Sequence, residues 1–346
     1  MKKVLHVLAT SSFSGAENVA CDIILNLSNK YRLVYCSPRG NIEKKLKNKN
    51  IEYIPIKKLN LKEIKTVIKK YNPDIIHAHD YRTAFLCSLV KKRKKLIIHL
   101  HNNSPWLKKI CINSFIFLYS AIKADSILIV SDSIKNEYIF KKIISKKIIC
   151  VSNPVSRTKV LKQVKKIYTL EEKRYDLCCV ARITKQKNPE RFIKIIQILK
   201  KDFPLIKVIW VGEGEYKEKF IKKCKELGLS DNILFLGFQD NPYKYMNESK
   251  IFLLTSDWEG YGLVAFEALS LGLPCVVSKV GGLVNIVDDS CGKLCNIDNI
   301  DNFVKEISNL LKNEKYFNSK SHAAIKKSCF LDNFASYYKK IDEVYN

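Results

Sequence analysis

The stretch KIFLLTSDWEGYGLVAFEALSLGLPCVVSKVGG (residues 250–282) contains two apolar runs joined by a glycine-marked turn and a helical pattern. Apolar strands that alternate with helices are typical of a parallel sheet covered on both faces. Inside the helical pattern stands Glu267, whose neighbours three and four residues away are mostly apolar. A buried carboxylate without a partner is costly. We therefore expect Glu267 to be buried and either paired within the protein or satisfied by a polar ligand.

The same alternation extends along the whole chain of 346 residues and predicts an α/β protein with two doubly wound, Rossmann-like domains. Ligands bind such sheets at the carboxyl ends of the strands. A charged, irregular stretch at 156–176 is expected to link the domains. The predicted strands are KKVLHVLAT, RLVYCS, EYIPI, DIIHAHD, LIIHLHN, SILIVSD and KIICVSN, then LCCVAR, KVIWVGEG, ILFLGF, KIFLLTSD and PCVVSKVGG.

We place the domains at 1–164 and 165–330. The remaining segment, 331–346, is predicted to be an amphipathic helix. It could close the second domain or cross back onto the first.

Composition indicates a soluble globular protein, because 47% of the residues are hydrophobic and 27% are charged. The net charge of +27 favours an acidic partner. Only 8 of the 61 basic residues are arginines, which disfavours specific reading of nucleic acid bases. Two interpretations of the lysines stay open, namely a solvated surface and peripheral attachment to an anionic membrane.

The twelve cysteines are irregularly spaced, without a CxxC pair, and are expected to be reduced thiols of a cytoplasmic protein. Cys291 and Cys295 do not favour a zinc site, because no histidine or second cysteine pair is near in sequence. No apolar run reaches the length of a membrane span. For ICINSFIFLYSAIKA (110–124) a core helix is favoured over a helix that lies on lipid.

Polar residues follow the predicted strands of the first domain. Gly15 stands at a strand-to-helix turn, where a glycine lets backbone N–H groups approach a phosphate. Five of the six histidines belong to this domain, among them the pairs HAHD (77–80) and HLH (99–101). We expect one histidine of each pair to pack inside and the other to face a ligand.

In the second domain, VARITKQKNPERF places Arg182 and Lys187 five residues apart between a strand and a helix. Both could bind one anion from a loop at the carboxyl edge of the sheet. GEGE (212–215) is interpreted as a turn and not as a phosphate loop, because its two carboxylates would oppose an anion.

EGYGLVAFEALSLGLPCVVSKVGG (259–282) resembles the signature of the retaining nucleotide-sugar glycosyltransferases of the GT-B fold, also described as glycosyltransferase family 4 or glycosyl transferases group 1. Its two glutamates are Glu259 and Glu267. The resemblance spans nearly the whole chain through SGAE, PDIIHAHD, VSNPV, VARITKQKNP, WVGEGE and LGF. The chain departs from the pattern at GGLVNIV, where a Pro-Glu pair is usual, and at VSNPV, where Asn-Gly is common.

The resemblance implies two domains that face a central cleft and a donor site in the second domain. Arg182 and Lys187 would bind the diphosphate, together with the free N–H groups of a helix that begins at 262–264 (Gly262, Leu263 and Val264). Glu267 would bind the ribose, and Glu259 the transferring sugar.

From the first domain, the resemblance implies that His101 and Gly15 complete the donor site. The implied catalytic residues are therefore Glu259, His101, Arg182 and Lys187. His79 and Arg82 are candidates for the acceptor side. No metal or other cofactor is implied, because the nucleotide sugar is a substrate.

The predicted function is retaining hexosyl transfer from a nucleoside diphosphate sugar to a glycan acceptor. The expected acceptor is a lipid-linked intermediate of capsular, exo- or lipopolysaccharide synthesis at the inner face of the cytoplasmic membrane. A nucleotide-sugar epimerase or hydrolase on the same fold is the alternative enzyme. A basic protein that binds lipid or nucleic acid on a degenerate scaffold is the rival from another class, and the intact Arg182, Lys187, Glu259 and Glu267 set disfavours it.

Overall fold

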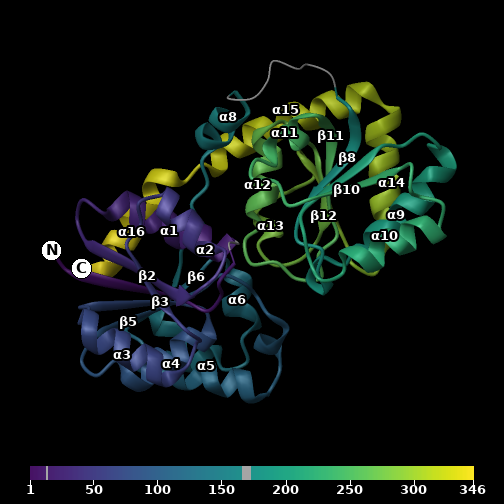
Figure 1. Cartoon of the computed structure of the whole chain (residues 1–346). Helices are drawn as coiled ribbons and strands as arrows, with labels where there is room; N and C mark the ends of the chain where they lie inside the picture. Colours follow the sequence, from purple (N-terminus) through teal and green to yellow (C-terminus); the bar gives the residue numbers. More distant parts are fainter. Residues whose placement is uncertain (13–14, 166–172) are drawn as a thin grey trace. The chain divides into compact units, whose positions relative to one another are not determined.

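A computed structural model describes residues 1–12, 15–165 and 173–346. The chain divides into two compact units (Figure 1). The first unit comprises Met1–Pro154 together with Asn333–Asn346, and the second comprises Val155–Asp332.

The first unit contains a seven-stranded parallel sheet in the order β3-β2-β1-β4-β5-β6-β7. Its inner strands are almost wholly buried, which explains their continuous apolar sequences. Strand order reverses between β1 and β4, and this reversal is the point where doubly wound sheets bind ligands. The strands are β1 (Lys3–Leu8), β2 (Arg32–Pro38), β3 (Tyr53–Ile56), β4 (Ile75–His79), β5 (Lys95–Leu100), β6 (Ser126–Ile129) and β7 (Ile148–Cys150).

Helices cover both faces of this sheet, with α3, α4 and α5 on one side and α1 and α16 on the other (Figure 1). Local signals fix their ends: the Asp80 carboxylate accepts hydrogen bonds from the backbone N–H groups of Arg82 and Thr83 at the start of α4. The helices are α1 (Gly15–Leu27), α2 (Ile42–Asn48), α3 (Leu61–Tyr71), α4 (Tyr81–Val90), η1 (Pro105–Lys108), α5 (Ile112–Lys123), α6 (Asp132–Glu137), α7 (Lys141–Ile144), η2 (Ser145–Lys147) and α16 (Phe334–Tyr345).

The C-terminal helix α16 belongs to the first unit, so of the two alternatives left by the sequence the chain adopts the crossing one. It packs against α1 and buries Tyr337, Ile341 and Tyr345. Its outer side is joined to the loop after α1, where Lys30 Nζ lies 2.5 Å from an Asp342 carboxylate oxygen.

The second unit contains a six-stranded parallel sheet in the order β10-β9-β8-β11-β12-β13. Strand order reverses between β8 and β11. The sequence did not predict β13, because GKLC is short and lacks a continuous apolar run. The strands are β8 (Tyr175–Val180), β9 (Val208–Val211), β10 (Ile233–Gly237), β11 (Ser249–Leu254), β12 (Cys275–Ser278) and β13 (Gly292–Cys295).

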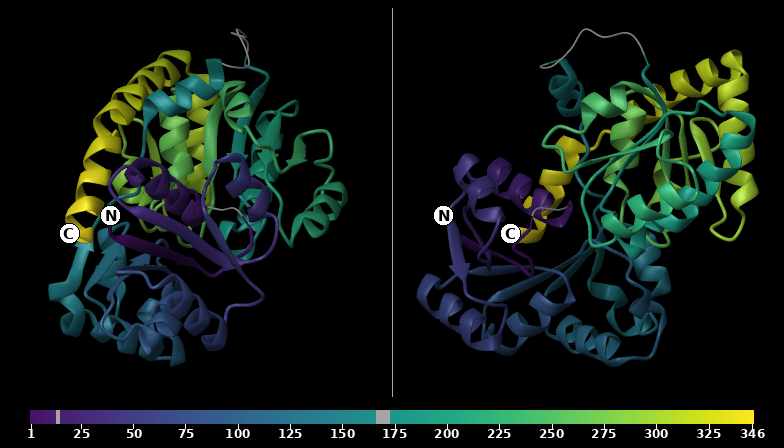
Figure 2. Two further views of the ribbon diagram at one scale, coloured as in Figure 1. Left: turned by 60° about the vertical axis from the view of Figure 1, so that its left-hand side comes forward. Right: turned by 45° about the vertical axis from the view of Figure 1, so that its right-hand side comes forward.

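Helices again lie on both faces of the sheet (Figure 2). On one side α9 packs against α10 and α14, and on the other α12 packs against α8, α13 and α15. The helices are α8 (Arg157–Lys165), η3 (Lys185–Lys187), α9 (Pro189–Asp202), α10 (Lys217–Glu226), α11 (Tyr243–Asn247), α12 (Leu263–Ser270), α13 (Leu283–Ile286), α14 (Ile300–Lys312) and α15 (Glu314–Leu331).

The described part of the segment expected to link the domains at 156–176 is mostly helix and strand. Residues 166–172 lie outside the described ones, but α8 precedes them and β8 begins at Tyr175. Because α8 packs on α11 and α12, the units divide between Pro154 and Val155 and not at 164. The second division follows Asp332, two residues after the predicted boundary at 330.

The twelve cysteines are free thiols, and nine of them are buried. Within the parts of the chain that the structure describes, no helix combines the length and the apolarity that crossing a bilayer requires.

Candidate active site

In the second unit, two loops leave neighbouring strands where the strand order reverses. Residues 181–188 follow β8, and residues 255–262 follow β11. Parallel strands place both loops at the same edge of the sheet, so side chains far apart in sequence meet there.

Lys187 and Glu259 form an ion pair between these loops. Their side chains are only 13% and 9% exposed. Ser256 Oγ donates a second hydrogen bond, of 2.7 Å, to the same Glu259 oxygen. The structure therefore brings together two residues that the sequence predicted for one site, and it fixes Glu259 on two donors.

A second ion pair, which the sequence did not predict, holds the loops in register. Arg191 on α9 lies 2.8 Å from the Asp257 carboxylate and also donates to the Thr255 carbonyl oxygen. Asn188 caps α9 and donates from its amide to Asp257. These contacts fix the backbone on either side of Lys187 and Glu259. The sequence hinted at these contacts only by placing the polar residues Asn188 and Asp257 close to Lys187 and Glu259.

Arg182 is exposed in the loop after β8 and, among the described residues, has no ion-pair partner. Its loop is held by the GEGE segment, because the Ile183 N–H donates to the Glu213 carbonyl oxygen at 3.0 Å. A Cβ atom on Gly214 would lie 2.2 Å from the Ile183 carbonyl oxygen, so the close approach requires glycine. GEGE thus supports the Arg182 loop, and its last residue, Glu215, begins a turn at 215–216.

The helix α12 begins directly after the loop that carries Glu259. Gly262 precedes it with φ +94°, and a Cβ there would lie 2.6 Å from the Leu283 side chain, so both conformation and packing require glycine. The N–H groups of Leu263 and Val264 lie in the first turn and have no acceptor within the helix. With the helix dipole they favour an anion at this point.

Glu267 lies in the second turn of α12; the residue as a whole is half-buried, and its carboxyl group is the part shielded from water. The Tyr243 hydroxyl donates to its Oε1 at 3.0 Å, a partner that no local sequence pattern indicated. Burial raises the pKa of Glu267 to about 7, against the opposing effect of this hydrogen bond. Near neutral pH the carboxyl group is therefore close to its titration midpoint and would gain from further hydrogen-bond donors.

In the first unit, Gly15 begins α1 after β1. Phe13 and Ser14 of the preceding loop lie outside the described residues. A Cβ atom on Gly15 would meet no described atom within 4 Å, and its φ is not in the left-handed region. Packing among the described residues therefore does not require glycine here, and a ligand could approach the backbone at the start of α1.

His79 and His101 lie at the carboxyl ends of β4 and β5, and their rings are hydrogen bonded at 2.8 Å. His79 is buried, and its other nitrogen is bonded to His6, so it does not offer the acceptor contact that was predicted. The expectation that one histidine of each pair faces outward is wrong for HAHD, whereas in HLH His99 is buried and His101 is half-buried. Residues two apart on a strand share a face, so His77 and His79 are buried together.

His101 is half-buried, and Arg82 is exposed and paired with Asp80 at 3.0 Å. The site residues thus form two groups. Arg182, Lys187, Glu259 and Glu267 belong to the second unit, and Gly15, His79, Arg82 and His101 belong to the first.

Two family models match the chain. The one described as Glycosyl transferases group 1 matches residues 161–328, and the one described as Glycosyltransferase Family 4 matches residues 13–159. The O-antigen biosynthesis glycosyltransferase WclY of Escherichia coli is 26% identical over 99% of this chain and 98% of its own.

A second relative matches a shorter part of the chain. The N-acetylgalactosamine-N,N'-diacetylbacillosaminyl-diphospho-undecaprenol 4-alpha-N-acetylgalactosaminyltransferase of Campylobacter jejuni is 34% identical over 39% of this chain and 37% of its own. Among solved structures, Anabaena Alr3699/HepE in complex with UDP and glucose has a TM-score of 0.86 and 18% identity, and covers 100% of this chain and 99% of its own.

Proposed function

This chain belongs to the glycosyltransferases of the GT-B fold, and we propose that it transfers a sugar from a nucleoside diphosphate to a glycan acceptor with retention of the anomeric configuration. The Lys187–Glu259 ion pair beside the start of α12 is the observation that supports this proposal most directly.

The second unit supplies the groups that a nucleoside diphosphate sugar needs. Arg182 provides a guanidinium without an ion-pair partner in the described residues, and Lys187 provides an ammonium at the same strand end. Both positive charges, with the N–H groups at the start of α12, would offset the charge that develops on the diphosphate as it leaves. Glu267 would accept hydrogen bonds from the ribose, and Glu259 from the transferring sugar.

The first unit would contribute His101 near the donor sugar and the backbone at Gly15. Arg82 is the remaining candidate for the acceptor side, because His79 is buried. No metal is assigned to the transfer, since the basic side chains and the helix start together provide the positive charge that it needs.

The proposed acceptor is a lipid-linked glycan intermediate of surface polysaccharide synthesis. Its support is the likeness to an O-antigen enzyme and to an enzyme whose name specifies a diphospho-undecaprenol acceptor. A nucleotide-sugar epimerase or hydrolase remains the alternative, and it differs because it would consume the donor with no acceptor present.

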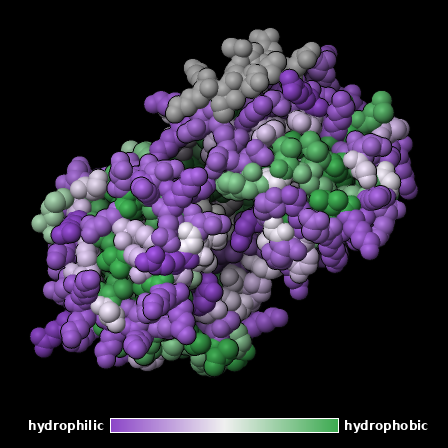
Figure 3. Space-filling view, viewed as in Figure 1, coloured by the Kyte–Doolittle hydropathy of each residue, from purple (hydrophilic) through white to green (hydrophobic). Residues whose placement is uncertain are grey.

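We also propose that the protein works at an anionic membrane surface, in line with a cytoplasmic, peripheral location. One face of α5 exposes Ile112, Phe115, Tyr119 and Ile122, although the sequence favoured a core helix. Hydrophobic atoms are visible where Figure 1 places α5 (Figure 3). Exposed lysines flank this face, and we call the set the α5 surface: Ile110, Ile112, Phe115, Tyr119, Ile122 and Ile143 with Lys108, Lys109, Lys123, Lys141, Lys142 and Lys146.

An apolar helix face bordered by cations fits the interface of an anionic bilayer. Each lysine near such a surface contributes about 1 kcal/mol of attraction. An anionic membrane that binds the α5 surface would therefore be the acidic partner that the high net charge of the chain favours.

The function is tested in two steps. A thermal-shift panel of nucleoside diphosphates and their sugars identifies the donor, since a ligand at 100 times its Kd stabilises the folded state by about 2.7 kcal/mol. The donor is then incubated with and without lipid-linked glycan acceptors, and the anomeric configuration of the product is read by NMR. Acceptor-dependent transfer with retention supports the proposal, and donor turnover without acceptor contradicts it.

A further inference from the structure

Five histidines lie close together in the first unit: His6 on β1, His77 and His79 on β4, His99 on β5, and His101 just after β5. Burial lowers the pKa of His6 and His101 to about 3 and holds the pKa values of the other three well below 6.5. All five rings are therefore neutral at pH 7. A neutral imidazole has one N–H donor and one acceptor nitrogen.

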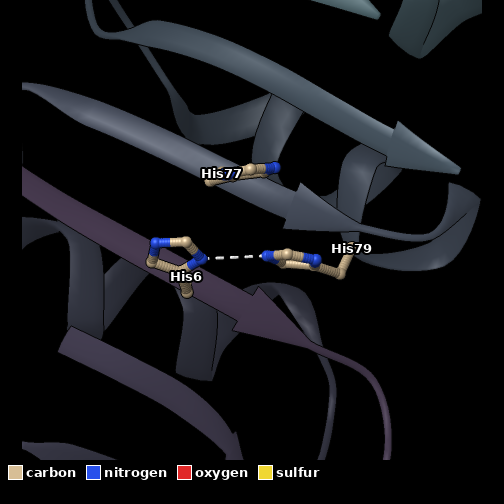
Figure 4. Close-up of side chains that lie close together, drawn as sticks. All are labelled: His6, His77 and His79. Carbon is tan, nitrogen blue, oxygen red and sulfur yellow. Dashed lines mark hydrogen bonds between the residues drawn. The ribbon is translucent and has the colours of Figure 1, made fainter. Parts of the chain in front are cut away.

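The cluster satisfies one requirement of a metal site, because His6, His77 and His79 each bring a nitrogen within 4.8 Å of the others. Their rings, however, are stacked: His77 and His79 are 4.3 Å apart between centroids with a 16° angle between planes (Figure 4). Nitrogen lone pairs lie in the ring plane, so near-parallel stacked rings do not direct them at one ion. The geometry favours hydrogen bonding over coordination.

The hydrogen bonds join the rings in single file, with the hydroxyl of Tyr345 from α16 in the middle. We call these six residues the histidine chain. Its successive links are His99 Nδ1 to His77 Nε2 (3.2 Å), His77 Nδ1 to Tyr345 Oη (2.8 Å), Tyr345 Oη to His6 Nε2 (3.2 Å), His6 Nδ1 to His79 Nε2 (2.9 Å, Figure 4) and His79 Nδ1 to His101 Nε2 (2.8 Å).

Every link joins Nδ1 of one ring to Nε2 of the next, directly or through the phenol. The five rings must therefore all carry their proton on Nδ1 or all carry it on Nε2. Where two rings meet directly, a ring out of step would set N–H against N–H on one side or lone pair against lone pair on the other. Across the phenol, two N–H groups could both donate to Tyr345 Oη, but the buried O–H would then have no acceptor. In a buried site such a mismatch loses hydrogen bonds that water cannot replace.

The two ends of the histidine chain select between these states. His99 Nε2 is buried and, in the described part of the chain, has no hydrogen-bond partner, so an N–H there would be uncompensated. At the other end, His101 Nδ1 is also buried without a hydrogen-bond partner among the residues described, but so is the acceptor Asn153 Oδ1, and the Asn153 side chain raises the pKa of His101 against the effect of burial. The end at His101 is thus the better place for an N–H.

We propose that the histidine chain holds His101 as the Nδ1–H tautomer, and that Tyr345 is the positioning residue that couples the two halves of the chain. His101 then directs its N–H toward Asn153 and accepts from His79 at Nε2, so both ring nitrogens are engaged and the ring is held in one orientation for its contact with the donor sugar. This last step rests on the proposed function, whereas the tautomer itself does not.

The tautomers can be read directly from the full-length protein labelled with 15N-histidine, by long-range proton–nitrogen correlation NMR at pH 7. The signal of His322, the exposed sixth histidine, is identified by its loss in His322→Gln. We expect the five remaining histidines to be Nδ1–H. Any of them found as Nε2–H overturns the proposal, and this measurement requires no variant within the histidine chain.

Tyr345→Phe removes the central hydroxyl and leaves two separate segments. We expect the 15N signals of His6 and His77 to shift and His101 to become a mixture of tautomers. Tyr337→Phe is the matched control, because Tyr337 is also buried on α16 and, within the described residues, its hydroxyl has no partner. If His101 stays wholly Nδ1–H in a folded Tyr345→Phe protein, the coupling through Tyr345 is overturned.

The kinetic consequence separates this inference from the function on which it rests. We expect kcat for transfer to fall about two- to tenfold in Tyr345→Phe, the effect of one neutral hydrogen bond, and to stay unchanged in Tyr337→Phe. If the tautomer of His101 changes in Tyr345→Phe but kcat does not, the role of His101 in transfer is overturned, whereas the proposed tautomers of the histidine chain are not. A wild-type protein that transfers no sugar contradicts the proposed function, while the NMR pattern is unaffected.

Discussion

The Lys187 ammonium is bonded to the Glu259 carboxylate, so an ion pair connects the loop after β8 to the loop after β11. Lysine has a long, flexible side chain, and the carboxylate restrains it at the strand end where a diphosphate would bind. Glu259 can therefore affect transfer by contacting the sugar or by positioning Lys187, and substitutions can separate these roles.

Glu259→Gln keeps the size of the side chain and removes its charge. We expect nucleoside diphosphate affinity to stay at the wild-type level or to rise slightly, because Lys187 loses a competing anion. The kcat for transfer should fall about 10- to 100-fold if the carboxylate acts mainly in the transition state. Calorimetric titration and a transfer assay measure the two effects. Glu190→Gln, at an exposed glutamate, is the control, and a parallel loss of affinity would assign Glu259 to positioning Lys187 alone.

Arg182→Ala and Lys187→Ala should each weaken nucleoside diphosphate binding by about 1.5 to 3 kcal/mol, the usual effect of losing a charged hydrogen bond. Binding of the bare nucleoside, which has no phosphates, should change little. Arg174→Ala, near the opposite end of β8, and Lys185→Ala, in the same turn as Lys187, are matched controls. An equal loss for nucleoside and diphosphate would mean that the residues support the fold.

Glu267→Gln should weaken nucleoside diphosphate binding and reduce the preference for ribose over 2'-deoxyribose. We expect the wild-type protein to bind the ribonucleotide about 10- to 100-fold more tightly, because the deoxy sugar lacks one donor to a carboxylate. Titration of both nucleotides into both proteins measures this ratio. A ratio that is the same in the two proteins would remove Glu267 from the ribose site.

Glu267 should also make stability depend on pH. Its pKa is about 7 in the folded protein against an ordinary value of 4.5, so its contribution to stability is fully present below pH 4.5 and is lost as pH rises through 7. We expect Glu267→Gln to gain about 2 to 3 kcal/mol relative to wild type between pH 5 and pH 8. Urea unfolding at the two pH values tests this, and a gap that does not change with pH would contradict the raised pKa.

The α5 surface should bind anionic vesicles. We expect the protein to sediment with them at low salt and to leave them as ionic strength rises, since salt screens the lysines. Phe115→Asp should weaken this binding, whereas Phe330→Asp, at an exposed phenylalanine of the second unit, should not. Equal binding to neutral vesicles would exclude electrostatic attraction, and no binding to either would contradict the membrane surface.

The sequence predicted both sheets, and it predicted which strand-end loops carry the residues of the candidate site, because these signals are local. Continuous apolar runs mark buried parallel strands, and the polar residues directly after them, such as Arg182 and Glu259, must lie at one edge of the sheet. The strand β13 escaped prediction because GKLC has a glycine and a lysine among four residues. The helix α8 was also missed, because its lysine-rich sequence is locally similar to that of a linker.

Two parts of the site were beyond local signals. Tyr345 is hydrogen bonded to His77 across 268 positions of sequence, and no periodicity indicates such a contact. The Tyr243–Glu267 bond likewise depends on where α11 packs. The joint burial of His77 and His79, by contrast, could have been predicted, because the two-residue period of a strand implies that they share a face.

The return of α16 to the first unit has a consequence for the order of folding. A ribosome synthesises the segment 155–332 before it makes Tyr345. The first unit therefore lacks α16, and its face beside α1 stays uncovered, until the second unit has been synthesised. The second unit is continuous in sequence and can complete its core first, although its synthesis begins later. Proteolysis of stalled nascent chains should accordingly find the second unit protected before the first.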